Sequence, residues 1–312
     1  MDITGKPGAG TSVRDAKSGT LAPARGTTPD RRWRTIFSCA EIRVTLSAVA
    51  ELWNDLIACL DLSAVDGTSF EGKNLPLDYH RLFGGQLLAQ FATAATLSAP
   101  GKSVKSLHAL FPREGTAEEP VRYEVAKHQD GRTFAALTIV ARQSKGVIGT
   151  ASVSLHAHED GPAVQTVADV AGTPEDCDPV EIGLMPFEIR ASADLNAREA
   201  AAPEYSLWFR TLQAAAEHAQ ALAAYATDLT LIGTALRAVD GVSQADAQQA
   251  FASAVTSHTI WFHRQFRTDD WLLLRQHSPI LAHARSFGRG DILTSDGTLV
   301  ASYAQEAMVR FR

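Results

Sequence analysis

The chain has 312 residues, enough for one large core or two smaller ones. Its 45% hydrophobic and 21% charged residues are typical of a globular protein, and a net charge of −6 argues against a nucleic-acid-binding field. Cys39, Cys59 and Cys177 lack CxxC spacing, which indicates reduced thiols rather than a disulfide framework or zinc site. Without a bilayer-spanning apolar run or a secretory signal, we expect a cytoplasmic protein.

The N-terminal stretch, to about Arg34, is rich in Gly, Ser, Thr, Pro and Ala and poor in large apolar side chains. Such a segment cannot bury enough surface to offset its ordering entropy, so residues 1–40 are predicted to be a disordered extension. Its arginines and serines would also suit a transit peptide, but Asp2, Asp15 and Asp30 argue against that alternative.

Three helices follow from the spacing of apolar residues. An amphipathic helix is predicted over Leu46–Leu62. A buried helix is expected after Arg81–Gln86, where two glycines allow a tight entry into the small apolar run Leu87–Ala95. The stretch Tyr225–Leu236 is apolar on almost every side, so we expect a helix that the second half of the chain wraps. Asp228 lies near its start, where a carboxylate suits capping and the helix dipole.

Strand patterns follow each buried helix. The hairpin signal Asp130-Gly131 separates two of them. The main predicted strands are Val104–Phe111, Val121–His128, Thr133–Arg142, Val147–His156, Thr256–Phe266, Trp271–Ser278, Ala284–Leu293 and Thr298–Arg310. Residues 159–184, rich in Asp, Glu, Gly and Pro, are predicted to link two domains at 41–158 and 185–312.

The two halves of the chain repeat each other. Ser144–Ser152 parallels Ser295–Ser302, and Arg132-Thr133-Phe134 parallels Arg285-Ser286-Phe287. Each half therefore runs from a buried helix into consecutive antiparallel strands. This order predicts an α+β fold in which one helix is wrapped by an antiparallel sheet, twice.

A set of short motifs carries a resemblance, and their order and spacing are specific. They are Phe83-Gly84-Gly85-Gln86, Asp130-Gly131-Arg132-Thr133-Phe134, Trp261-Phe262-His263-Arg264 and Asp296-Gly297-Thr298-Leu299-Val300-Ala301-Ser302. From about Leu56 to Arg310 the chain resembles the type II acyl-CoA thioesterase family. The resemblance implies a double hot-dog fold with its two sheets joined edge to edge. It also implies hydrolysis of acyl-CoA to a free fatty acid and coenzyme A in lipid metabolism, without a cofactor, by a homodimer or larger homo-oligomer.

The resemblance also implies a site in the second half. The family uses an aspartate, a threonine or serine, and a glutamine to hold and activate a water. The aspartate that opens the second buried helix matches Asp228, the expected general base, whose pKa an apolar surrounding would raise. The glutamine of the last strand matches Gln305, which would orient the water, whereas the hydroxyl position is occupied by Val255.

Val255 leaves the role of the hydroxyl to a neighbour or to an added water. Because side chains alternate along a strand, Val255 and Ser257 are expected on the face of Trp261, and Thr256 and His258 on the opposite face. Ser257 would have to reach from one residue further along, and Thr256 would need a β-bulge to turn inward. Both are candidate catalytic residues, and His258 is a candidate substrate-binding residue or a structural core histidine.

Gly84, Gly85 and Gln86 are the remaining candidate substrate-binding residues. Free amides at a helix N-terminus can polarise a carbonyl oxygen, although these residues can also simply shape the helix entry. No metal site is predicted, because His156 and His158 have no third ligand placed nearby by the sequence.

Two functions remain open. The first is an acyl-CoA thioesterase that uses Asp228 and Gln305. The second, motivated by Val255, is a protein that binds acyl-CoA or an acyl-carrier thioester with weak or no turnover. A hot-dog dehydratase or hydratase is less favoured, because its histidine with an acidic partner on the buried helix is not apparent. No nucleic-acid partner and no membrane span are expected, and the acyl chain length cannot be read.

Overall fold

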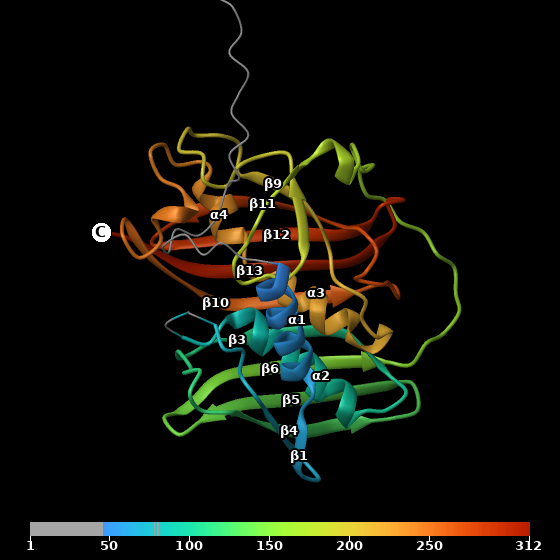
Figure 1. Ribbon diagram of the computed structural model, residues 1–312. Helices are drawn as coiled ribbons and strands as arrows, with labels where there is room; N and C mark the ends of the chain where they lie inside the picture. The colour runs from blue at the N-terminus through green and yellow to red at the C-terminus, as the bar shows by residue number, and fades with distance from the viewer. Residues whose placement is uncertain (1–45, 78, 80) are drawn as a thin grey trace, which may run out of the picture. The chain divides into compact units, whose positions relative to one another are not determined.

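The structure is a computed structural model that describes residues 46–312 except 78 and 80, and Figure 1 shows its elements. The predicted disordered extension, residues 1–40, lies outside the described residues. The α-helices are α1 (Leu46–Leu60), α2 (Gly84–Ser98), α3 (Ala219–Ala226) and α4 (Leu231–Leu236). Short 3-10 helices cover Pro174–Asp176, Ala216–His218 and Gln244–Asp246. None of these helices is long and apolar enough to cross a membrane.

The strands divide between the two halves of the chain. The first half contributes β1 (Ser63–Asp66), β2 (Ser69–Gly72), β3 (Ser103–Leu110), β4 (Val121–Asp130), β5 (Phe134–Gln143) and β6 (Gly146–His156). The second contributes β7 (Asp178–Pro179), β8 (Glu188–Ala191), β9 (Glu204–Arg210), β10 (Phe251–Phe262), β11 (Leu272–Ala282), β12 (Arg285–Thr294) and β13 (Leu299–Phe311). Residues 159–184, expected as a linker, thus contain a 3-10 turn and the short strand β7.

All the strands form one sheet, in the order β1-β2-β4-β5-β6-β3-β10-β13-β12-β11-β9-β8-β7. The order β2-β4-β5-β6-β3 in the first half is mirrored by β9-β11-β12-β13-β10 in the second, which confirms the predicted repeat. The halves meet where β3 pairs antiparallel with β10, from Leu110 opposite Ser257 to Ser106 opposite Trp261. The expected edge-to-edge joining of two hot-dog sheets is therefore confirmed.

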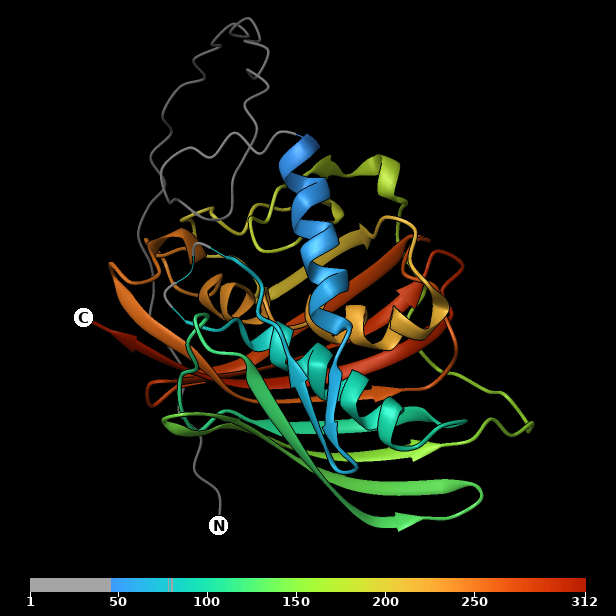
Figure 2. The ribbon, with the colours of Figure 1, turned by 60° about the horizontal axis from the view of Figure 1, so that its bottom comes forward.

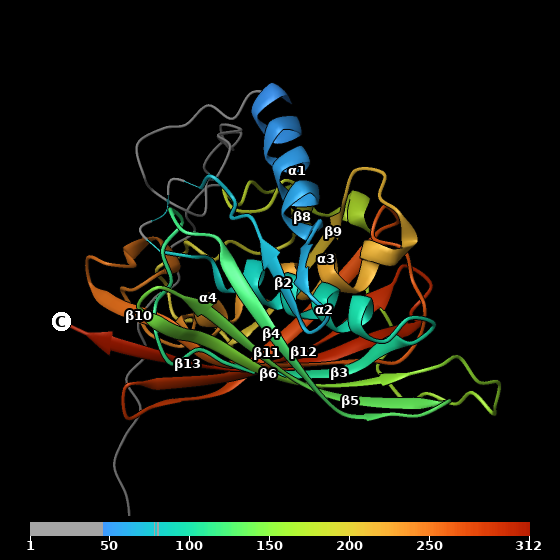
Figure 3. The same ribbon diagram turned by 90° about the horizontal axis from the view of Figure 1, so that it is seen from below.

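The helices lie against one face of this sheet (Figures 2 and 3). α2 and α3 pack against each other, so the two wrapped helices meet beside the joint between the half-sheets. α1 covers them with Trp53, Leu56 and Leu60, spaced on one helical face and all buried. The Trp53 ring packs edge-on against Phe187 of the second half, with ring centroids 6.3 Å apart. The core thus runs continuously from one half into the other.

The prediction of a single helix over Tyr225–Leu236 is wrong. α3 ends at Ala226 and α4 begins at Leu231, so Thr227 to Thr230 form a break between two short helices. The Thr227 hydroxyl lies 2.9 Å from the carbonyl of Ala224, a local hydrogen bond of the kind by which threonine competes with helical backbone bonding. The N-cap residue of α4 is Thr230, so Asp228 is not the cap of the helix that follows it.

Candidate active site

Asp228 lies in the break between α3 and α4, with only 6% of its surface exposed. Its carboxylate meets the N-terminus of α2, in the other half of the chain, where the backbone N–H of Gly85 donates a hydrogen bond to it. α2 has no side-chain cap of its own and no acidic residue in its first turn. Asp228 therefore supplies the negative charge that a helix N-terminus attracts, but to α2 rather than to the helix that follows it.

Two glycines make this approach possible. A methyl group at Gly84 would lie 2.9 Å from Asp228 Oδ2, and one at Gly85 would lie 2.7 Å from the backbone carbonyl of Tyr225. Both distances are shorter than a carbon atom tolerates, so glycine is required for α2 to contact the α3–α4 break. The two glycines, both predicted as substrate-binding candidates, thus border the carboxylate directly.

We expect Gly84→Ala to lower any activity that depends on Asp228 by about 10²-fold, because the added methyl displaces the Asp228 carboxylate. Gly67→Ala is the matched control, since a methyl there meets nothing within 4 Å. The measurement is kcat of both variants beside their melting temperatures. A Gly84→Ala variant that melts and turns over like the control would contradict the close approach.

The burial of Asp228 changes its titration. Desolvation raises the pKa of the carboxyl from 3.8 to about 7, although the Gly85 amide and the positive charge of Arg81 act in the opposite direction. A carboxylate with a pKa near neutral pH can take a proton from water and return it within one catalytic cycle. This is the property that the sequence analysis expected of a general base.

Gln305 and His258 face each other on neighbouring strands. The residues are direct partners in the β10–β13 pairing, and both side chains are buried. The amide oxygen of Gln305 accepts a hydrogen bond from Nδ1 of His258, over 3.0 Å. The Nε2 atom of His258 lies 3.0 Å from the hydroxyl of Thr227, the residue before Asp228. The network thus brings Gln305 into the same part of the molecule as Asp228.

Three buried atoms of this region have no hydrogen-bond partner among the described residues: Gln244 Oε1, Asp228 Oδ1 and Gln305 Nε2. Oδ1 of Asp228 is an acceptor, and Nε2 of Gln305 is a donor, and both are buried. Unpaired buried polar atoms are costly, and functional sites are where folded proteins retain them. A water can donate to the carboxylate and accept from the amide, so each of the two atoms can bind a water molecule.

Strand β10 contains a β-bulge at the position where the expected hydroxyl is missing. Val255 pairs with Ala307, whereas Ser257 pairs with Glu306, so Thr256 is an extra residue between them. The register shift places Val255 on the same face as the buried Ala307 and Gln305, and not with Trp261 as strict alternation predicts. Val255 therefore lies on the inner face of the sheet, opposite Ala307, which is two residues after Gln305 on β13.

The two hydroxyl candidates lie differently. The Thr256 hydroxyl donates to the backbone carbonyl of Glu306 over 3.0 Å, so the bulge does not leave it free as a donor. Ser257 lies opposite the exposed Leu110, on the face away from the helices. The structure thus brings together Asp228, Gln305 and His258 but does not bring Ser257 to them.

Gln86 is occupied by structural contacts. Its amide oxygen accepts from the backbone of Leu75, and its nitrogen donates to Asn74 and to Gln90. These bonds fix the loop that precedes α2, so any direct contact of Gln86 with substrate would use its backbone.

A second buried network holds the other side of the α3–α4 break. In it, the Gln276 side chain accepts from the Tyr303 hydroxyl and donates to the hydroxyls of Thr230 and Thr234.

Sequence reasoning missed Thr227 and Arg81. Thr227 carries a detectable signal, since a hydroxyl beside the candidate base in an apolar stretch is unusual. Arg81 carries none, because its guanidinium donates to the carbonyl of Ser253, 172 residues away, over 2.8 Å. The contact with Ser253 ties the loop before α2 to strand β10. Arg81 also pairs with Glu114, at 2.9 Å.

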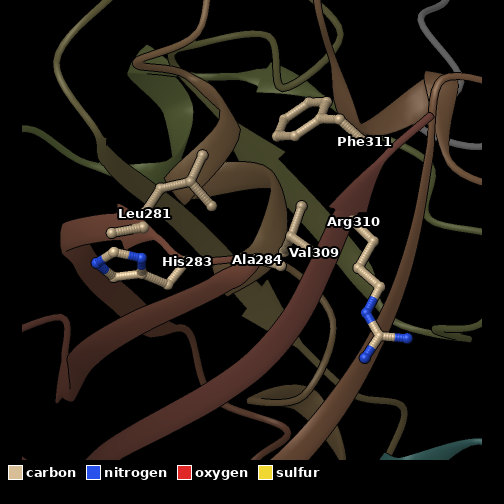
Figure 4. Close-up of a pocket in the computed structure, with 7 residues that line it drawn as sticks. Leu281, His283, Ala284, Val309, Arg310 and Phe311 are labelled. Atoms are coloured by element: carbon tan, nitrogen blue, oxygen red, sulfur yellow. The ribbon is translucent and has the colours of Figure 1, made fainter.

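Two surface depressions of the described residues lie away from this site. Figure 4 shows one between the β11–β12 hairpin and the end of β13, lined by side chains that include Leu281, His283, Val309 and Phe311. A second lies on the sheet face over β3, β5 and β6, beside Trp261. Within the described residues, no group of three or more His, Cys, Asp or Glu side chains could hold a metal ion.

The two mirrored half-sheets, joined edge to edge and covered by helices on one face, define a double hot-dog protein. Residues 75–156 match the family described as the acyl-CoA thioesterase N-terminal domain, and residues 159–309 match the corresponding C-terminal domain. The chain is 31% identical over 288 residues to acyl-CoA thioesterase 2 of Haemophilus influenzae, covering 84% of this chain and 99% of that protein.

Solved structures show the same relationship. A TesB protein of Mycobacterium avium subsp. paratuberculosis is 29% identical with a TM-score of 0.70, covering 82% of this chain and 99% of that chain. Acyl-CoA thioesterase II TesB2 of Mycobacterium marinum is 28% identical with a TM-score of 0.70, covering 82% of this chain and 98% of that one. The chain belongs to the type II acyl-CoA thioesterase family.

Proposed function

We propose that this protein hydrolyses acyl-CoA thioesters to a free fatty acid and coenzyme A. The observation that carries the proposal is the pair of buried, unpartnered atoms, Asp228 Oδ1 and Gln305 Nε2. Relatives named acyl-CoA thioesterase supply the substrate class. A water held between the two atoms would be both positioned and deprotonated.

The proposed step needs only water and the thioester. The water oxygen attacks the thioester carbonyl carbon while Asp228 takes one of its protons. The tetrahedral intermediate then collapses, its C–S bond breaks, and the coenzyme A thiolate recovers the proton from Asp228. The N-terminus of α2, at Gly84 and Gly85, stands beside the base and is where a developing negative charge on the carbonyl oxygen would be favoured.

Thiol release from a panel of acyl-CoAs, from short to long chains, tests the proposal. We expect steady turnover of at least one substrate at a rate that depends on Asp228. Absence of release from every substrate would contradict hydrolysis. If acyl-CoA then still raised the melting temperature, the protein would be one that binds the thioester and turns it over weakly.

Val255 specifically favours this second function, because its side chain lies on the inner face of β10 and cannot hydrogen-bond a water. We expect Val255→Thr to raise kcat about five- to tenfold, the effect of one added hydrogen bond. Val65→Thr, at an exposed residue of β1, is the control. Negligible wild-type turnover that appears in Val255→Thr would support the binding function, whereas fast wild-type turnover unchanged by the substitution would exclude it.

We further propose domains at residues 41–158 and 185–312, joined by 159–184, with the catalytic residues in the second. Thr256 stays a catalytic candidate, because its hydroxyl oxygen can still accept a hydrogen bond from the water while it donates to Glu306. Ser257 stays a candidate only if the strand pairing at the bulge changes.

We propose a homodimer or larger homo-oligomer, which light scattering after gel filtration would test. A cytoplasmic location agrees with the free thiols of Cys59 and Cys177.

A further inference from the structure

His258 is a fully enclosed titratable side chain beside the proposed site. It is 0% exposed, and both of its ring nitrogens have protein partners. Its ring also stacks against that of Tyr303, at 6.1 Å between centroids and 10° between planes. The hydroxyl of Tyr303 is in turn bonded to Gln276, so the plane of the imidazole is held from a second side. A histidine enclosed in this way has no nitrogen left to offer a substrate.

The hydrogen bonds indicate which ring nitrogen of His258 carries the proton. The amide oxygen of Gln305 can only accept, so Nδ1 of His258 carries a proton. Burial lowers the pKa of His258 from 6.5 to about 4, so the ring is neutral at physiological pH and its Nε2 atom is bare. Nε2 then accepts from the Thr227 hydroxyl, 3.0 Å away. In this arrangement the single hydroxyl proton of Thr227 points to Nε2 and not to the carbonyl of Ala224, which lies 2.9 Å from the same oxygen.

The proton on Nδ1 decides which end of the Gln305 amide is free. The oxygen and nitrogen of a glutamine amide have nearly the same shape, so packing alone does not select between them. The N–H of His258 does select, because it bonds the oxygen and leaves the NH2 group as the unpartnered donor. If the ring carried its proton on Nε2 instead, the amide would turn, and two acceptors would border the site.

We infer that His258, with Thr227 behind it, is a positioning residue that holds the Gln305 amide with its NH2 group towards the reacting water. The inference rests on the proposed function. His258 touches neither water nor thioester in this role and acts only through Gln305. Removal of the His258 side chain is expected to lower kcat and to leave KM unchanged, because the Gln305 amide loses its orientation while the contacts with substrate remain.

A double-mutant cycle tests the inference. We expect Gln305→Ala and His258→Leu each to lower kcat by about 10- to 100-fold, and the double variant to be no slower than Gln305→Ala alone. His258→Asn should recover most of the activity, since its side-chain nitrogen can replace Nδ1 as a donor. His128→Leu is the control, because His128 is an exposed residue of β4 that lines the depression beside Trp261, on the other sheet face. Additive losses, or His258→Asn as slow as His258→Leu, would overturn the inference.

A second readout does not require activity or a folded His258→Leu variant. The ¹⁵N shifts of the ring in histidine-labelled wild-type protein, assigned with His258→Asn, report which nitrogen carries the proton. We expect the proton on Nδ1, and a proton on Nε2 would overturn the inference. If Asp228→Asn left hydrolysis unchanged, the proposed function itself would fail. Dependence on Asp228 combined with an additive cycle would reject only the role of His258.

Discussion

Asp228→Asn is expected to lower thioester hydrolysis by about 10³-fold or more, because the amide cannot accept a proton from water. The substitution keeps the size of the side chain and an oxygen that can accept from the Gly85 amide, so the contact with α2 is retained. The measurement is thiol release at saturating acyl-CoA beside the wild type. A variant that retains tight acyl-CoA binding locates the loss in the chemical step.

Asp66→Asn is the matched control for this substitution. Asp66 is an aspartate at the β1–β2 turn whose carboxylate accepts from Thr68 and Ser69, on the surface. Its replacement leaves the Asp228 surroundings unchanged and is expected to leave kcat unchanged. An Asp228→Asn variant as active as Asp66→Asn would remove the base from the proposed step and leave the water to be activated by another group.

The same substitution is expected to stabilise the protein at alkaline pH. The folded-state pKa of Asp228 is about 7, above its ordinary value of 3.8, so between these values the native state binds a proton that the unfolded state has lost. Stability therefore falls as pH rises from about 4 to 7, by up to about 4 kcal/mol. Asp228→Asn lacks this titration and should exceed the wild type in unfolding free energy at pH 8, with the difference vanishing near pH 4.

Urea unfolding at pH 4.5, 6 and 8 measures this difference. Asp66→Asn again serves as the control, with the opposite sign, because hydrogen bonds from Ser69 and Thr68 lower the pKa of Asp66 to about 2. Its carboxylate stabilises the fold above pH 3.8, so its replacement should destabilise slightly at neutral pH. If Asp228→Asn were less stable than the wild type at every pH, the prediction would be wrong. The carboxylate would then stabilise the fold through its contact with α2, and its burial would not lower the free energy of unfolding.

The parts of the fold that local patterns encode were predictable. Alternation of apolar residues located β4, and Asp130-Gly131 placed the turn that follows it, because neighbouring residues decide both. The repeat predicted two similar units, and the structure shows them as a mirrored strand order, since two copies of one pattern bury their apolar faces in the same way. The resemblance then named Asp228 and Gln305, which the structure places in one region, each with an unpartnered atom.

Long-range contacts determined what the sequence could not predict. The α3–α4 break places the Asp228 carboxylate at the N-terminus of α2, more than a hundred residues earlier in the chain. Strand β10 begins at Phe251, five residues before the predicted start, because Phe251 to Val255 pair with the end of β13. The bulge at Thr256 follows from the same pairing, and it alone moves Val255 to the inner face. No local pattern encodes any of these contacts.

The most direct test of the account is the pH dependence of kcat/KM for acyl-CoA hydrolysis, measured as thiol release from pH 5 to 9. A general base with the pKa of Asp228 predicts a rate that rises with pH and reaches half its maximum near pH 7. Asp228→Asn should abolish that rise along with the activity. A wild-type rate that is constant from pH 5 to 9, or a midpoint that persists in Asp228→Asn, would contradict a buried Asp228 as the base.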